Sequence, residues 1–160
     1  MLITSLTQKI EWLANKSKLF YTLVEFYYKN IIKNEVRLAS ISKDDKILCI
    51  GGGPCPYTAI MLHTYTGAHI TVVDNNYHCV KKSLELIYRL GLQNYINVVL
   101  SDGKDIDCHG FTVIHLAMQI SPKEKVLKNL LDGAEYGTKI LVRMPKEILS
   151  GLYCNVNCKV

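Results

Sequence analysis

The chain has 160 residues, of which 49% are hydrophobic, 21% charged and 9% aromatic. This length suits one domain that buries a core without metal or disulfide support, and the composition excludes disordered, collagen-like and coiled-coil chains. No window of about 18 apolar residues occurs, so we expect no transmembrane helix and no membrane partner. The N-terminal residues lack the basic start and apolar block of a secretory signal. We therefore expect a cytoplasmic globular domain.

The net charge of +5 results from 19 Lys and Arg residues against 14 Asp and Glu residues, spread along the chain. A dispersed surplus mainly serves solubility. An RNA-binding domain would more often show a stripe of arginines interleaved with aromatic residues, so a nucleic-acid partner is disfavoured. The six cysteines include no C-x-x-C pair, and we expect reduced thiols rather than disulfides. Cys154 and Cys158 could hold a metal only with two outside ligands, so we predict no metal site.

Residues 1–40 are predicted to form a small helical cap. Long apolar and aromatic side chains recur at steps of three and four from Leu13 to Ile32. This spacing predicts a short N-terminal helix followed by a second helix over about 17–34. We interpret the aromatic-rich stripe as core packing.

Beyond residue 40, short apolar or β-branched runs alternate with segments of helical periodicity. Strands are predicted over 46–50, 69–74, 96–100, 111–116 and 138–142, and helices over 57–64, 76–90 and 123–132. In the helix over 76–90 we expect Val80, Leu84, Ile87 and Tyr88 on one apolar face and Gly91 as the stop. The alternation predicts an α/β fold with a doubly wound, mainly parallel, Rossmann-like sheet. We treat residues 41–160 as one compact unit.

Three groups of residues follow the predicted strands, at the edge where open α/β sheets bind ligands. After the first strand, three glycines let the backbone turn tightly and approach a ligand, and the next helix N-terminus attracts negative charge. Asp74 ends the second strand and can accept hydrogen bonds from ribose hydroxyls. Asp102 and Gly103 follow the third strand and can meet an adenine edge. With the neighbouring strand-end residues, the candidate cofactor-binding residues are Gly51, Gly52, Gly53, Pro54, Asp74, Asn75, Asp102, Gly103, Ala117 and Met118.

Each group also has a purely structural interpretation: a tight turn for the glycines, a helix cap for Asp74 and a plain turn for Asp102. The glycine loop itself restricts the ligand. A dinucleotide fingerprint has glycine at its first, third and sixth positions, but the sixth position here is Pro56. The prolines at 54 and 56 also remove amide donors that a pyrophosphate would use. A nucleoside without a pyrophosphate fits better, and S-adenosylmethionine is such a ligand.

The segment 50–60, I-G-G-G-P-C-P-Y-T-A-I, resembles the G-S/G-G-P-L-P-L-T-x-I loop of nicotianamine synthases and their prokaryotic relatives. Its two prolines and its threonine are more specific than its glycines, since ordinary methyltransferases usually carry G-x-G-x-G there. Further similar segments are 67–74, 111–129, 140–143 and 151–153, so the resemblance covers about residues 30–155.

This resemblance implies the class I methyltransferase fold and an S-adenosylmethionine-dependent enzyme. Members of the family transfer an aminocarboxypropyl group onto an amine and build metal chelators, while close sequence neighbours are often described simply as methyltransferases. A family active-site glutamate precedes the glycine loop, and Glu35 is its match here. A base at that position can promote attack by a neutral amine; the alternative is a solvated glutamate on a helix surface. Members also continue past strand five into a closing strand pair, which we expect to be missing because this sequence stops at Val160.

The sequence therefore predicts an S-adenosylmethionine-dependent, methyltransferase-like transferase that acts on a small-molecule acceptor, an amine. After the fourth strand, residues 116–120 read L-A-M-Q-I, where amino-methylating enzymes often place D/N-P-P-Y/F, so nucleic-acid amines are disfavoured as acceptors. Two alternatives stay open: nicotianamine synthase-like aminocarboxypropyl transfer in metallophore synthesis, and a non-catalytic S-adenosylmethionine-binding module. A dinucleotide-binding oxidoreductase is disfavoured by Pro56. Homo-oligomerisation is left open.

Overall fold

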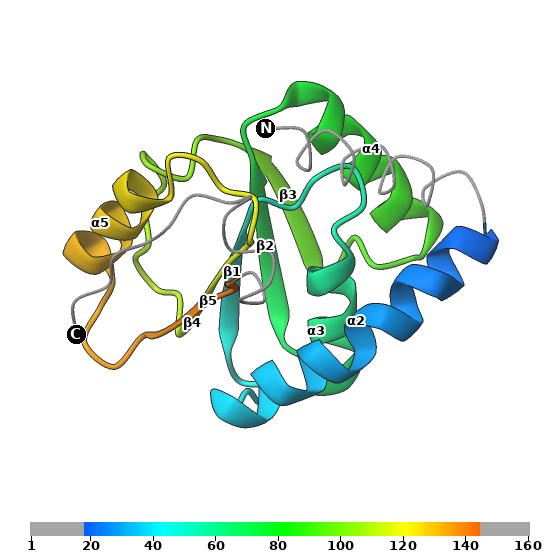
Figure 1. Cartoon of the computed structure of the whole chain (residues 1–160), viewed down its shortest axis with the longest axis horizontal. Coiled ribbons are helices and arrows are strands. Elements are labelled where there is room, and N and C mark those ends of the chain that lie inside the picture. The colour runs from blue at the N-terminus through cyan, green and yellow to red at the C-terminus, as the bar shows by residue number, and fades with distance from the viewer. Residues whose placement is uncertain (1–17, 145–160) are drawn as a thin grey trace.

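The computed structural model describes residues 18–144, with side chains described from Tyr28 onward. Helices and strands alternate along the chain (Figure 1): α2 (Lys18–Leu38), β1 (Lys46–Ile50), α3 (Tyr57–Thr66), β2 (His69–Asp74), α4 (Tyr77–Arg89), β3 (Ile96–Leu100), β4 (Val113–Leu116), α5 (Lys123–Gly133) and β5 (Lys139–Val142). The predicted short N-terminal helix, Cys154 and Cys158 lie outside the described residues, and so does the segment on which the expected lack of a closing strand pair depends. Within residues 18–144, no helix is both long and apolar enough to cross a membrane.

The strands form one parallel sheet in the order β3-β2-β1-β4-β5. β1 lies in the middle, where Ile50 pairs with Val73 of β2 and with Leu116 of β4. The carboxyl ends of these three strands therefore lie level with one another. The chain extends the sheet to one side through β2 and β3 and then to the other side through β4 and β5. Open α/β sheets bind ligands at this point of reversal, outside the carboxyl ends of the strands.

Helices cover both faces of the sheet. Alternate residues of each strand point to opposite faces, so each strand contributes side chains to two cores. In β1, Ile47 and Cys49 belong to the core beneath α2, α3 and α4. Leu48 and Ile50 belong to a second core beneath α5. Figure 1 shows α5 on one side of the sheet and the other helices on the opposite side. The predicted doubly wound α/β fold with a parallel sheet is thereby confirmed.

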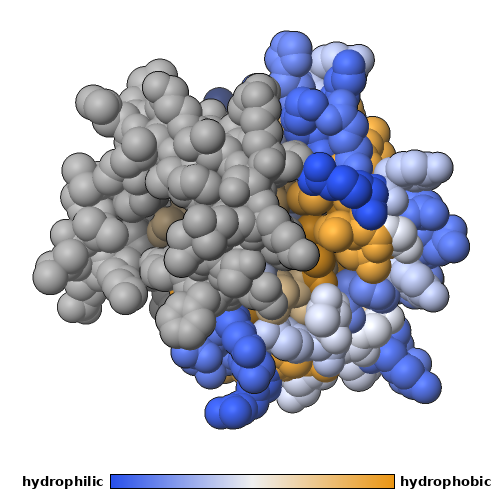
Figure 2. Space-filling model, turned by 90° about the vertical axis from the view of Figure 1, so that its right-hand side faces the viewer, coloured by the Kyte–Doolittle hydropathy of each residue, from blue (hydrophilic) through white to orange (hydrophobic). Residues whose placement is uncertain are grey.

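The apolar face predicted for α4 is partly wrong. Val80 and Ile87 are buried as expected, but Leu84 is 47% exposed and Tyr88 is 75% exposed. The buried side of the helix instead includes Ser83, whose hydroxyl donates a hydrogen bond of 2.7 Å to a carbonyl oxygen of the glycine loop. A buried hydroxyl with such a partner costs little. Figure 2, which views the molecule from the right-hand side of Figure 1, shows an apolar area with hydrophilic residues above it and to its right.

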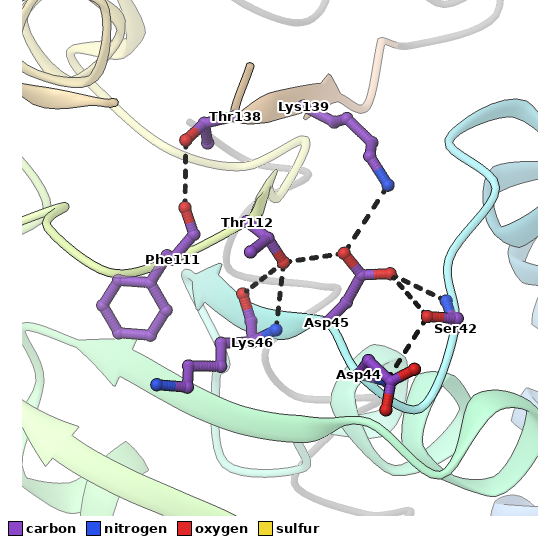
Figure 3. Close-up of polar contacts among 8 residues, drawn as sticks. All are labelled: Ser42, Asp44, Asp45, Lys46, Phe111, Thr112, Thr138 and Lys139. Carbon is purple, nitrogen blue, oxygen red and sulfur yellow. Dashed lines mark hydrogen bonds and ion pairs between the residues drawn. The ribbon is translucent and has the colours of Figure 1, made fainter. Parts of the chain in front are cut away.

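At the amino edge of the sheet, Asp45 joins the starts of three strands (Figure 3). The Thr112 hydroxyl donates to the Asp45 carboxylate at 2.7 Å, and the Lys139 ammonium lies 3.5 Å from the same oxygen. The backbone N–H of Ser42 donates to the other carboxylate oxygen at 2.8 Å. This network holds β1, β4 and β5 in register at the edge opposite the predicted ligand site.

Candidate functional site

A pocket of about 250 Å³ lies at the carboxyl edge of the sheet, across β1, β2 and β4. The structure brings the predicted cofactor-binding residues together there, with one exception: Pro54 does not line the pocket. Those that line it are Gly51, Gly52, Gly53, Asp74, Asn75, Asp102, Gly103, Ala117 and Met118. Residues from loops after four strands thus converge on one cavity, as the switch-point rule predicts.

The glycine loop, residues 51–53, packs closely against β2. At each of its three positions the structure shows why the residue is a glycine. Gly51 and Gly53 have φ angles of +87° and +63°, a left-handed conformation that favours glycine. A Cβ on Gly52 would overlap the side chain of Val72. The N–H groups of Gly51 and Gly52 donate to the carbonyl oxygen of Val73 at 2.8 and 3.2 Å. The loop is therefore a tight turn and a wall of the pocket at once.

Asp74 anchors the loop rather than capping the next helix. Its Oδ2 accepts a hydrogen bond of 2.7 Å from the N–H of Gly53, and its Oδ1 accepts one of 2.9 Å from the N–H of Asn76. The cap of α4 is Asn76, whose side chain accepts from two backbone N–H groups of the first turn. A carboxylate offers about four acceptor positions, so Asp74 keeps capacity for two hydroxyl donors.

Asp102 and Gly103 form a local turn and also line the pocket. The Oδ1 of Asp102 accepts from the N–H of Lys104 at 3.1 Å, and its Oδ2 lies 3.2 Å from the Lys104 ammonium. These hydrogen bonds and that charge lower the pKa of the Asp102 carboxyl. A Cβ on Gly103 would lie 2.6 Å from Cγ2 of Ile50, so only glycine fits this close approach to β1.

Glu35 is not a solvated surface residue. Its side chain is 14% exposed and forms a two-pronged ion pair with Arg143, whose Nε donates to Oε1 at 3.0 Å and whose Nη2 donates to Oε2 at 2.7 Å. Nε2 of His115 lies 3.4 Å from the same Oε1. Glu35 itself does not line the pocket, but His115 and Arg143 do. We call Glu35, His115 and Arg143 the buried polar cluster.

The rest of the Arg143 environment also comes from the pocket wall. Its Nη1 donates to the hydroxyl of Thr58 at 3.1 Å, and its guanidinium lies 5.3 Å from the ring centre of Tyr28. Both residues line the pocket. Arg143 therefore joins α2, α3 and the segment after β5 at one end of the cavity.

Charge and burial fix the protonation states of the buried polar cluster. Burial raises the pKa of Glu35, but hydrogen bonds and charge interactions with His115 and Arg143 outweigh it and lower the pKa to about 2. Burial lowers the pKa of His115, Glu35 opposes this shift, and Arg143 adds to it. These shifts favour a carboxylate at Glu35 and an uncharged imidazole at His115 near neutral pH.

Sequence reasoning missed His115, Arg143, Thr58 and Tyr28 as pocket residues. Two signals could have found the first two. A histidine within an otherwise apolar buried strand requires a polar partner, and Arg143 directly follows β5, at the same carboxyl edge as the predicted residues. Neither signal names the partner, because Glu35 lies 80 residues before His115 and 108 before Arg143.

Comparisons with known proteins agree with the fold. Crystal structures of a Glu-to-Gln mutant of MtNAS, alone and in complex with S-adenosylmethionine, superpose with a TM-score of 0.82 at 26% sequence identity over 98% of this chain. An RNA methyltransferase from Salinibacter ruber, in complex with S-adenosyl-L-homocysteine, shares the fold with a TM-score of 0.65 at 20% identity, over 71% of this chain and 74% of its own.

A curated relative, L-histidine 2-aminobutanoyltransferase of Yersinia pestis, is 24% identical over 135 residues, which are 82% of this chain. The chain spans 51% of the length of that relative, and 61% and 63% of the two MtNAS chains. The model of the family described as nicotianamine synthase protein matches residues 11–160. The resemblance seen in the sequence is confirmed: this chain belongs to the nicotianamine synthase family.

Proposed function

We propose that this protein is an S-adenosylmethionine-dependent transferase that moves the aminocarboxypropyl group onto the amine of a small molecule. The observation that carries the proposal is the pocket, where the glycine loop, Asp74 and Asp102 meet at the switch point of a class I methyltransferase fold. Family membership and the name of the Yersinia pestis relative support aminoalkyl transfer. The MtNAS complex supports S-adenosylmethionine as the donor.

The pocket residues fit this donor. Asp74 would accept from the ribose hydroxyls, the backbone of Gly51–Gly53 would pass along the amino-acid portion, and Asp102 with Gly103 would meet the adenine. Asn75, Ala117 and Met118 would complete the cofactor wall, and Pro54 would act only through the shape of the loop. When bound, S-adenosylmethionine supplies a sulfonium leaving group, so the protein mainly positions the acceptor and excludes water.

The acceptor end of the pocket is proposed to be the end formed by Tyr28, Thr58, His115 and Arg143. Glu35, the carboxylate predicted for catalysis, supports this end through its contacts with His115 and Arg143. α2 contributes Glu35 and packs Ile32 into the core beneath α3. The division into a helical cap over residues 1–40 and an α/β unit over 41–160 remains a prediction. A cytoplasmic location remains a prediction, and homo-oligomerisation remains open.

Product analysis tests the proposal. The full chain is incubated with S-adenosylmethionine and a panel of primary amines that includes L-histidine, and the nucleoside products are separated by chromatography. Methylthioadenosine is expected, because transfer of the aminocarboxypropyl group leaves the methyl group on sulfur. S-adenosylhomocysteine would instead establish methyl transfer, and tight cofactor binding without either product would establish a non-catalytic binding module.

A further inference from the structure

His115 occupies an unusual place for a histidine. It lies within β4, with Cys49 of β1 and Leu141 of β5 as its neighbours in register, and it is 2% exposed. Each other residue of β4 is apolar and buried. Burying an imidazole ring in such a strand costs free energy, because the ring loses its hydrogen bonds to water, whereas an apolar side chain has none to lose. We therefore expect His115 to have a role beyond packing. His115 also lines the pocket.

Glu35 is poorly suited to take a proton from the acceptor. Both of its carboxylate oxygens receive N–H groups of Arg143, at 3.0 and 2.7 Å, and it does not line the pocket. Its pKa of about 2 makes it a weak base toward an ammonium group. The carboxylate can, however, stabilise a positive charge on the imidazole 3.4 Å away.

We propose that His115 is the proton acceptor that converts the acceptor ammonium into a neutral amine, with Glu35 stabilising the imidazolium and Arg143 holding Glu35 in place. This inference rests on the proposed function. The Nε2 of His115 faces Glu35 at 3.4 Å, so the ammonium gives one proton to the other ring nitrogen, Nδ1. The freed nitrogen lone pair forms the new C–N bond, the C–S bond of the sulfonium breaks, and its electron pair stays on sulfur as a neutral thioether. His115 returns its proton to water.

The surroundings of His115 suit this cycle. Burial lowers the pKa of the ring, which keeps it uncharged and able to accept a proton at neutral pH. A hydrogen bond to its own backbone and the contact with Glu35 both favour the charged form, while Arg143 opposes it. Among the residues whose side chains the structure describes, the charged and titratable groups in or beside this part of the pocket include Glu35 and Tyr28 from α2, Cys49 from β1, Tyr57 from α3, and Arg143. Burial raises the pKa of the Cys49 thiol to about 12, so this thiol does not compete for the role.

The test compares His115→Gln with the wild type and with His63→Gln. His63 lies on α3 outside the pocket. Its Nδ1 lies at hydrogen-bond distance, 2.9 Å, from the carbonyl oxygen of Ala68, so His63→Gln controls for the histidine-to-glutamine substitution itself. The measurement is methylthioadenosine formation from S-adenosylmethionine and L-histidine, as kcat/KM between pH 6 and 10. Calorimetry of S-adenosylmethionine binding shows whether the cofactor site is intact.

At pH 7 we expect His115→Gln to lose about 10²–10⁴-fold in kcat/KM, the usual contribution of a positioned base. Cofactor affinity should stay near that of the wild type, and His63→Gln should be fully active. The loss should shrink about tenfold per pH unit as hydroxide takes over deprotonation of the amine. A structural role would instead lower the rate equally at each pH.

The outcomes separate the two proposals. If the wild type forms no methylthioadenosine with any amine, the proposed function is wrong and the role of His115 is withdrawn with it. If the wild type is active and the His115→Gln profile runs parallel to the wild-type profile, only the role of His115 is wrong. His115→Phe keeps a planar aromatic ring but has no ring nitrogen. It is measured in the same way in case the Gln variant does not fold. Unfolding of both variants would make His115 a structural core residue and overturn the inference.

Discussion

Replacing Glu35 by Gln should destabilise the protein in a pH-dependent way. The substitution keeps the size of the side chain and removes its charge, so it leaves Arg143, whose side chain is 12% exposed, with a neutral partner. The pKa of Glu35 is lowered from its ordinary value of 4.5 to about 2. A difference of roughly 2.5 pKa units at about 1.4 kcal/mol each corresponds to about 3 kcal/mol of unfolding free energy. Removing one partner of a buried ion pair costs a similar amount, about 3–5 kcal/mol.

The direction of the pH dependence follows from the lowered pKa of Glu35. Because the folded state binds this proton more weakly than the unfolded chain, the contribution of Glu35 is fully present above about pH 4.5 and is lost as the pH falls toward 2. Urea unfolding of wild type and Glu35→Gln at several pH values should therefore give a difference of about 3 kcal/mol at pH 7 that narrows steadily below pH 4.5.

Two further variants sharpen this experiment. Glu85→Gln makes the same chemical change at an exposed pair with Lys82 and should leave the unfolding midpoint unchanged. In the double variant Glu35→Gln/Arg143→Met, no buried charge is left without a partner, so much of the lost stability should return. A difference between wild type and Glu35→Gln that stays constant from pH 7 to pH 3 would refute the ion-pair explanation.

Three other predictions address the pocket and the core. Asp74→Asn removes the carboxylate charge that accepts from the N–H of Gly53 and is proposed to accept from the ribose. Calorimetry should show the binding free energy of S-adenosylmethionine reduced by about 1–3 kcal/mol. Equal affinity would contradict the assignment of Asp74 to the cofactor site. Gly52→Ala forces a Cβ into Val72 and should cost about 1–3 kcal/mol in urea unfolding, whereas Gly133→Ala, which meets no atom within 4 Å, should cost little. The buried thiol of Cys49, with its raised pKa, should resist iodoacetamide at pH 8 until urea unfolds the chain, as peptide mass spectrometry would reveal.

The strands were predictable because their short apolar runs end at turn-forming residues. β1 and β2 begin and end where the pattern predicts. Gly51 directly follows β1, and Gly67 separates α3 from β2. α2 is less well predicted: it continues to Leu38, four residues past the expected end, because no glycine or proline stops it. Helix ends of this kind depend on tertiary contacts, which a single sequence does not display.

The candidate site also has a part that the local sequence predicts and a part that depends on tertiary contacts. The proposed cofactor side follows from local rules, because Gly51 directly follows β1, Asp74 ends β2 and Asp102 lies two residues after β3. The acceptor side depends on which residues of distant elements meet. Glu35 was predicted from a family resemblance, but nothing in its own segment indicates that Arg143 occupies both of its oxygens.

The ion pair between Glu35 and Arg143 connects α2 to the residue that directly follows β5. A buried ion pair adds little net stability compared with well-packed apolar residues, because both charges lose their hydration. Its value therefore lies in specificity: the fork of Arg143 fits only a carboxylate held in one orientation, which fixes α2 relative to the end of β5. The same contact holds Arg143 at the end of the pocket that we propose for the acceptor. We therefore expect packing of α2 and assembly of the proposed acceptor end to be coupled, so a substitution that loosens α2 should lower transfer to the amine before it affects cofactor binding.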